Sequence, residues 1–232
     1  IALRKQRVAQ LEALGAPVAE QAQALRELAD SQDARGEIAD AKASLEKGLA
    51  LCRQASMKPV EVCYGIQVAR GQLAIIARDM PVADKLISSA YEDLQRRHQD
   101  SPQWAEALVA KGDLLSLQND NDKSFELYEE AMAVRGRLWG ARSVRLAKSR
   151  YELAMSLAQV GRFAQSVREM KQAHQAMVAA LGEQHFNSAI IELQLGLLQA
   201  SIGVEPGGEG HVKHAADIIL SQSDDVDKRM VF

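Results

Sequence analysis

The residue pattern of this 232-residue chain repeats at intervals of 41 or 42 positions. Small residues stand seven before, five after and twelve after each reference position, for example Ala154, Ser166 and Ala173 around Gly161. A period of this length is typical of stacked units that cannot bury their apolar faces alone. The pattern therefore predicts a stack of helical pairs. The five reference positions are Gly36, Arg78, Asn119, Gly161 and Gly203.

Within each repeat, apolar residues recur three or four positions apart on both sides of the reference residue, which is the helical period. We expect Gly161 to reverse the chain at a positive φ angle. Ala154 and Ser166, one on each flanking helix, should then meet where the two helices cross. First helices are expected at about 18–34, 60–77, 103–118, 144–160 and 186–202, and second helices at about 37–54, 82–97, 121–138, 163–180 and 211–221.

The period divides the chain into three parts. Residues 1–15 are expected to be the second helix of a truncated preceding repeat, so that the array would continue upstream of Ile1. Residues 223–232 are expected to form a C-terminal tail that frays or makes a capping contact. Between them, residues 16–222 are predicted to hold five repeats, at about 16–57, 58–99, 100–141, 142–183 and 184–222.

Composition narrows the function classes. Apolar residues make up 47% of the chain but aromatic residues only 4%, which favours closely packed, alanine-rich helices over sheets. The net charge of −3 gives no general attraction to nucleic acid or to an anionic membrane. No run reaches the ~18 apolar residues of a membrane span. Cys52 and Cys63 are expected to be buried free thiols in a reducing, cytoplasmic compartment, although the two could approach each other across the turn between two repeats.

The small residue, the glycine seven positions later and the alanines five and twelve beyond it resemble the tetratricopeptide repeat. The long unit and the segments 139–145 and 181–187 are similar to those of kinesin light chains and of bacterial regulators. The resemblance implies an all-α, right-handed superhelical solenoid of antiparallel helix pairs, with a concave groove lined by the first helices. It also implies an interaction scaffold for a protein or peptide partner, without a cofactor, within a larger signalling or regulatory protein. The alternative is a domain that senses a peptide or small molecule and controls a fused output domain, such as a transcription factor or a kinase.

The resemblance places partner-binding groove positions at fixed distances before each turn. These positions are mostly polar in the first repeats and apolar in the last ones, although the apolar ones could instead be covered by the next repeat or by the tail. The lysine and asparagine clamp of chaperone-tail binders is missing from them, which disfavours a heat-shock co-chaperone. The groove residues that we expect to bind a partner are Arg26, Asp30, Gln72, Val109, Asp113, Lys148, Tyr151, Met155, Leu193 and Leu197.

A basic patch interrupts the otherwise mixed charge pattern. Six basic residues fall within sixteen positions and no acidic residue lies among them, so the patch could hold an acidic partner segment, a phosphate or nucleic acid. The alternative is a solvated loop between helix ends, where cations are favoured near a helix C-terminus. Nucleic acid is disfavoured because aromatic residues for base stacking are scarce. The patch consists of Arg135, Arg137, Arg142, Arg145, Lys148 and Arg150.

Other candidate chemistry is weak. His211 and His214 have a spacing that can share a metal, but the sequence shows no third ligand, so no metal site is predicted. His174 occupies a slot that holds mostly apolar residues in other repeats and is expected to be packed. The sequence contains no phosphate-binding glycine loop, helical zinc motif or nucleophile elbow, and we therefore predict that the chain is not an enzyme.

Overall fold

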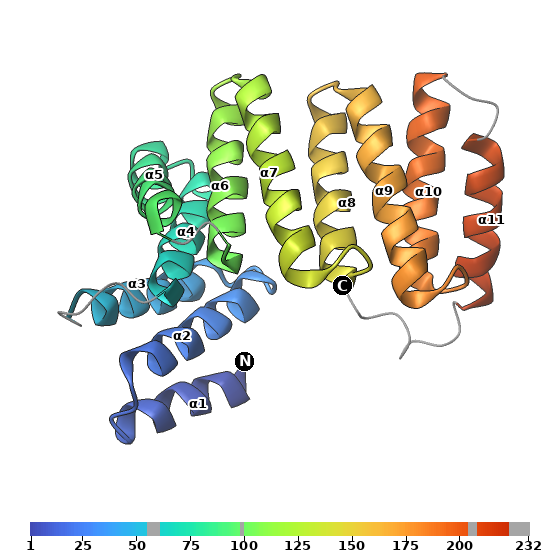
Figure 1. The fold of residues 1–232 in the computed structure, drawn as a ribbon. Coiled ribbons are helices and arrows are strands. Elements are labelled where there is room, and N and C mark those ends of the chain that lie inside the picture. The colour runs from blue at the N-terminus through green and yellow to red at the C-terminus, as the bar shows by residue number, and fades with distance from the viewer. Residues whose placement is uncertain (55–60, 98–99, 204–207, 223–232) are drawn as a thin grey trace. The chain divides into compact units, whose positions relative to one another are not determined.

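The computed structural model describes residues 1–54, 61–97, 100–203 and 208–222, and every regular element among them is an α-helix (Figure 1). The predicted all-α class is confirmed, and the expected helix ends lie within about one turn of those observed. The predicted tail at 223–232 lies outside the described residues. The helices are α1 (Ala2–Ala13), α2 (Val18–Asp33), α3 (Ile38–Gln54), α4 (Glu61–Ile76), α5 (Met80–Arg97), α6 (Pro102–Leu117), α7 (Asn121–Trp139), α8 (Val144–Gln159), α9 (Phe163–Leu181), α10 (Phe186–Ile202) and α11 (Gly208–Ser221).

The chain divides into two compact units, unit 1 at residues 1–134 and unit 2 at residues 135–232, with the boundary inside α7. In unit 1, consecutive helices from α1 to α6 pack against one another, and α4 also contacts both α2 and α6. In unit 2, α9 packs between α8 and α10, and α10 packs against α11. No helix in the described part of the chain is long and apolar enough to cross a membrane.

The five reference positions of the repeat all have a left-handed backbone. Gly161 has φ 77°, and its N–H donates to Ala158 O at 3.1 Å while Arg162 N–H donates to Leu157 O at 2.9 Å. This pair of hydrogen bonds satisfies the last carbonyls of the helix and reverses the chain. The predicted positive φ is therefore confirmed, and it extends to two non-glycine residues, Arg78 at 57° and Asn119 at 64°.

Small side chains let paired helices approach closely beside each turn. Ser166 Oγ donates a hydrogen bond to Ala154 O at 2.6 Å, and both residues are fully buried, as predicted for the helix crossing. A Cβ atom on Gly112 would lie 2.7 Å from Tyr128 Cε1, which is closer than real Cβ contacts. The repeat therefore depends on the absence of side-chain bulk at these slots.

Helix α11 begins at Gly208, earlier than the expected start near 211. Gly208 lies close to α10, since a Cβ atom on Gly196 would lie 2.7 Å from Gly208 O. Gly208 thus occupies the small-residue slot of its repeat and is buried there.

The expectation of free thiols is wrong. Cys52 at the end of α3 and Cys63 at the start of α4 form a disulfide, with a Cα–Cα distance of 5.9 Å that suits such a bond. The packing of α3 against α4 brings the two residues together across the junction of two predicted repeats. Because disulfides persist mainly in oxidising compartments, the cysteine argument for a cytoplasmic location no longer holds.

The substitution Arg78→Gly should stabilise the protein. A left-handed backbone costs a residue with a Cβ about 1–2 kcal/mol, and the greater freedom of glycine in the unfolded chain offsets part of the gain. We expect the free energy of unfolding to rise by about 0.5–1 kcal/mol in urea denaturation. Arg35→Gly removes an exposed arginine just before Gly36, at a position outside the left-handed region, and should give no gain. If Arg78→Gly is no more stable than the Arg35→Gly control, the left-handed backbone at position 78 does not cost the arginine the expected free energy.

Reduction of the Cys52–Cys63 disulfide should destabilise unit 1. Closing a loop with a sequence separation of 11 removes conformational freedom from the unfolded chain, which corresponds to about 2–3 kcal/mol. The measurement is urea denaturation with and without reductant. A Cys52→Ser, Cys63→Ser double variant should show no effect of reductant, and an unchanged unfolding midpoint in the reduced wild type would show that the bond contributes nothing.

Candidate functional site

The predicted groove positions of unit 1 are joined by polar contacts within the protein. Arg26 on α2 donates to Asp30 Oδ1 at 3.0 Å and to Glu106 Oε2 on α6 at 3.2 Å. Gly65 on α4 makes room for this guanidinium, since a Cβ there would lie 2.8 Å from Arg26 Nη1. Burial lowers the pKa of Arg26, but Glu106 and Asp30 together raise it above its usual value. Arg26 therefore links α2 to α6 across α4.

The remaining predicted groove residues of unit 1 are half-buried. Asp113 on α6 accepts a hydrogen bond from Tyr128 Oη at 2.6 Å. Burial, followed by the charge of Asp113 and this hydrogen bond, raises the pKa of Tyr128 well above its usual value. Gln72 and Val109 are half-buried. Arg26 and Asp113, two of the predicted groove residues of unit 1, thus have hydrogen-bond partners within the protein.

The predicted groove positions of unit 2 differ from those of unit 1. On α8, Lys148, Tyr151 and Met155 recur at helical spacing and share one stripe. Tyr151 and Met155 are half-buried against the α8–α9 core, and Lys148 is exposed. On α10, Leu193 packs partly against the α10–α11 core, whereas Leu197 is 48% exposed. The apolar groove residues predicted in the later repeats are therefore partly exposed to solvent in the structure.

The basic patch centres on an aromatic residue that the sequence analysis did not single out. The guanidinium groups of Arg135 and Arg145 lie 5.8 and 5.6 Å from the ring centroid of Trp139, within range of cation–π attraction. Arg137 in the last turn of α7 and Arg142 in the turn between α7 and α8 are both exposed. The structure thus combines a tryptophan with arginines in what we call the Trp139 cluster (Arg135, Arg137, Trp139, Arg142 and Arg145).

Arg150 has a different environment from the rest of the patch. It pairs with Glu169 of α9, whose side chain is only 4% exposed and which also accepts from Arg168 Nε at 3.4 Å. A buried carboxylate requires such partners, because an unpaired buried charge is strongly destabilising. Arg150 therefore holds α8 against α9, a contact that sequence spacing alone could not reveal.

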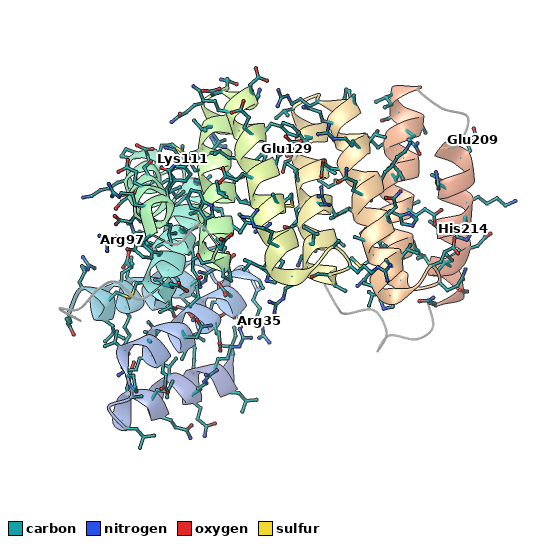
Figure 2. All side chains as sticks on the ribbon, viewed as in Figure 1. Arg35, Arg97, Lys111, Glu129, Glu209 and His214 are labelled. Atoms are coloured by element: carbon teal, nitrogen blue, oxygen red, sulfur yellow. A yellow bond between two sulfur atoms is a disulfide. The ribbon has the colours of Figure 1, made fainter. Side chains whose placement is uncertain are left out.

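A histidine cluster joins α10 to α11. Glu192 is 8% exposed, and its two oxygens lie 2.9 Å from His211 Nδ1 and 2.8 Å from His214 Nδ1. His214 lies on α11 (Figure 2). Burial raises the pKa of Glu192, but the hydrogen bonds from both histidines outweigh this and lower it. Hydrogen bonding to Glu192 raises the pKa of His214, whereas burial lowers that of His174. Among the described residues, no group of three ligand-type side chains could hold a metal ion.

No family model matches the chain, and no curated protein matches its sequence. Its fold does match solved structures. The crystal structure of BtubC (BKLC) from P. vanneervenii has a TM-score of 0.78 at 16% identity and covers 96% of this chain and 90% of its own. A putative kinesin light chain of Podosopora anserina with nearly identical TPR-like repeats has a TM-score of 0.69 at 14% identity, covering 88% and 96%.

A third match is more distant. The crystal structure of MamA has a TM-score of 0.50 at 12% identity and covers 90% of this chain and 97% of its own. At these identities the likeness concerns the fold. It confirms the predicted tetratricopeptide-like repeat fold of helical pairs, in the form seen in kinesin-light-chain repeats.

The substitution His214→Gln should destabilise the protein in a pH-dependent way. Because folding raises the pKa of His214, its stabilising effect is complete below about pH 6.5 and disappears as the pH rises through the folded pKa. The stability difference from wild type should therefore shrink as the pH rises above about 6.5. His174 titrates in both chains, so its own effect largely cancels in this difference.

The control for this measurement is Lys213→Gln on the same helix, an exposed change whose effect should not vary over the same pH range. Urea denaturation of the three chains at each pH gives both differences. A His214→Gln effect as constant as that of the control would contradict the role given to the Glu192–His214 contact.

Proposed function

We propose that this chain is a non-catalytic protein-interaction module and that unit 2 holds its docking surface. The observations that carry the proposal are the partly exposed apolar side chains of α8 (Tyr151 and Met155) and α10 (Leu193 and Leu197), together with the Trp139 cluster at the junction of α7 and α8. Helical repeats commonly bind a peptide or helix along such surfaces. The five-repeat division at about 16–222 belongs to the same proposal.

The charges of unit 2 suggest the chemistry of the partner. Arg142 and Arg145 are exposed and form no ion pair with a described residue, in contrast to Arg26 in unit 1, which binds two carboxylates. Lys148 begins the apolar stripe on α8, which places positive charge at one end of it. An amphipathic segment with apolar side chains and acidic residues at one end would fit this arrangement. The basic patch is therefore proposed as part of the docking surface, with Arg150 excepted.

The proposal also concerns the assembly in which the module would act. A module of this kind would act within a larger regulatory or signalling assembly, where its surface recruits one segment of another protein. The alternative, a domain that senses a small ligand, is favoured by one specific observation, a pocket beside the disulfide in unit 1. That pocket is distant in sequence from the docking surface, so the two roles are compatible.

The docking surface can be tested with a display library of random peptides. Peptides selected on the whole chain should be amphipathic and acidic, and fluorescence anisotropy with the synthesised peptides should show binding that weakens as salt rises. Leu197→Asp should weaken binding about tenfold or more, because it places a charge among the apolar side chains of the docking surface. The matched control is Leu220→Asp on α11, where the leucine is 68% exposed and should not matter.

Charge is tested separately. Arg142→Glu should weaken binding about fivefold at low salt, whereas Lys213→Glu makes the same charge change on α11 and should have little effect. The proposal fails if the selected peptides bind the Leu197 and Arg142 variants as tightly as wild type.

A further inference from the structure

A pocket of 420 Å³ lies between α3, α4 and α5 of unit 1. Its volume falls in the range of small-molecule sites. One wall is a stripe of α3 that includes Leu49 and Arg53, four residues apart. The facing wall is a stripe of α4 in which Cys63, Gln67 and Arg70 recur at helical spacing. Gln67 is held in place by donating to Leu86 O of α5 at 2.9 Å.

The disulfide forms part of this pocket. Both Cys52 and Cys63 line it, and Cys63 is 7% exposed whereas Cys52 is half-buried. A molecule in the pocket would therefore lie beside the disulfide, and Cys52, the more exposed of the two residues, is the one that we assign as the point of attack. Disulfide exchange requires such access to one of the two sulfur atoms.

The pocket has an excess of positive charge. Arg70, 8% exposed, donates through Nε at 3.3 Å and Nη2 at 3.1 Å to the same oxygen of Glu46. Arg53 forms no ion pair with a described residue, and its Nε donates to Leu49 O at 3.2 Å. Two arginines thus face a single carboxylate among the lining residues. Such a site attracts an anion, and guanidinium groups suit a carboxylate in particular.

We propose that this pocket binds a small anionic thiol, meaning a low-molecular-weight compound with both a thiol and a carboxylate, and that Cys52 exchanges disulfides with it. The carboxylate lies toward Arg53 and Arg70, and the apolar part of the ligand lies against Leu49. This inference does not depend on the docking surface of unit 2.

The exchange is balanced without another oxidant. The thiolate of the ligand attacks Cys52 Sγ and forms a new sulfur–sulfur bond, while the electron pair of the Cys52–Cys63 bond leaves on Cys63 Sγ. The resulting Cys63 thiolate lies in a pocket with two arginines, and nearby cations favour a thiolate. Attack of this thiolate on the mixed disulfide restores the original bond and releases the ligand as a thiolate.

The test compares two thiols on the oxidised 232-residue chain. 3-Mercaptopropionate carries the carboxylate, and 2-mercaptoethanol is a neutral reference, each used at the same thiolate concentration. Intact-mass spectrometry after acid quenching measures the rate of adduct formation, and peptide mapping locates the adduct. We compare the ratio of the rate with 3-mercaptopropionate to the rate with 2-mercaptoethanol. The same ratio measured on the chain unfolded in urea gives the intrinsic preference of the disulfide for one thiol over the other.

In the folded chain at low salt, the ratio should exceed this intrinsic value about fivefold, which is the effect of one opposite charge at about 4 Å in water. The adduct should form on Cys52. Glu46→Gln should raise the ratio and Arg53→Gln should lower it, whereas Arg35→Gln, the same charge change outside the pocket, should leave it unchanged. Arg53 and Arg35 are exposed, so these two variants should fold normally.

Three results would overturn the proposal. The first is a folded-state ratio equal to that of the unfolded chain, and the second is an adduct found on Cys63 alone. The third is the absence of any adduct with either thiol in the folded chain while the unfolded chain reacts.

Discussion

The close approach of paired helices is the constraint on which the rest of this structure depends. At Gly196, an added Cβ would meet the backbone oxygen of Gly208, and a backbone atom cannot move aside as the end of a side chain can. At Gly71 the nearest atom to an added Cβ is Ile87 Cγ1 at 2.5 Å, near the branch point of a fully buried side chain. With each helical pair closed in this way, one side of every helix is committed to its paired helix, and only the side chains on its other sides remain for further contacts.

The predicted groove positions differ between the two units. In unit 1, Gly65 lets the guanidinium of Arg26 pass over α4 and reach Glu106, so a ligand at these positions would have to replace existing ion pairs. In unit 2, the main polar contacts lie between paired helices, as for Glu169 and Glu192. This leaves half-exposed apolar side chains on α8 and α10 without a comparable polar bridge in the described contacts. This difference is the reason that the docking surface is proposed in unit 2.

The sequence was sufficient for features that recur with the repeat. The turn at Gly161 and the contact of Ala154 with Ser166 follow from periodic slots, and the structure confirms both. Polar partners do not recur in this way. Arg26 and Glu106 are 80 residues apart, and their contact depends on a single glycine on the helix between them. A period shows which positions face inward, but it does not show which charged side chains meet there, so Glu169, Glu192 and the role of Trp139 emerged only from the packing.

The effect of the disulfide on this repeat fold is confined to the junction of α3 and α4. Besides this bond, α3 and α4 are held by Arg70 with Glu46, and by Ile66, whose Cδ1 would lie 3.0 Å from a Cβ on Gly48. Ile66 is fully buried, so this contact persists whether or not the two sulfur atoms are joined. In a stack where each pair contacts mainly its neighbours, opening the bond would loosen one junction without unfolding the others. A thiol-dependent change at Cys52 would therefore adjust the coupling of two adjacent helical pairs rather than act as an on–off switch for the whole fold.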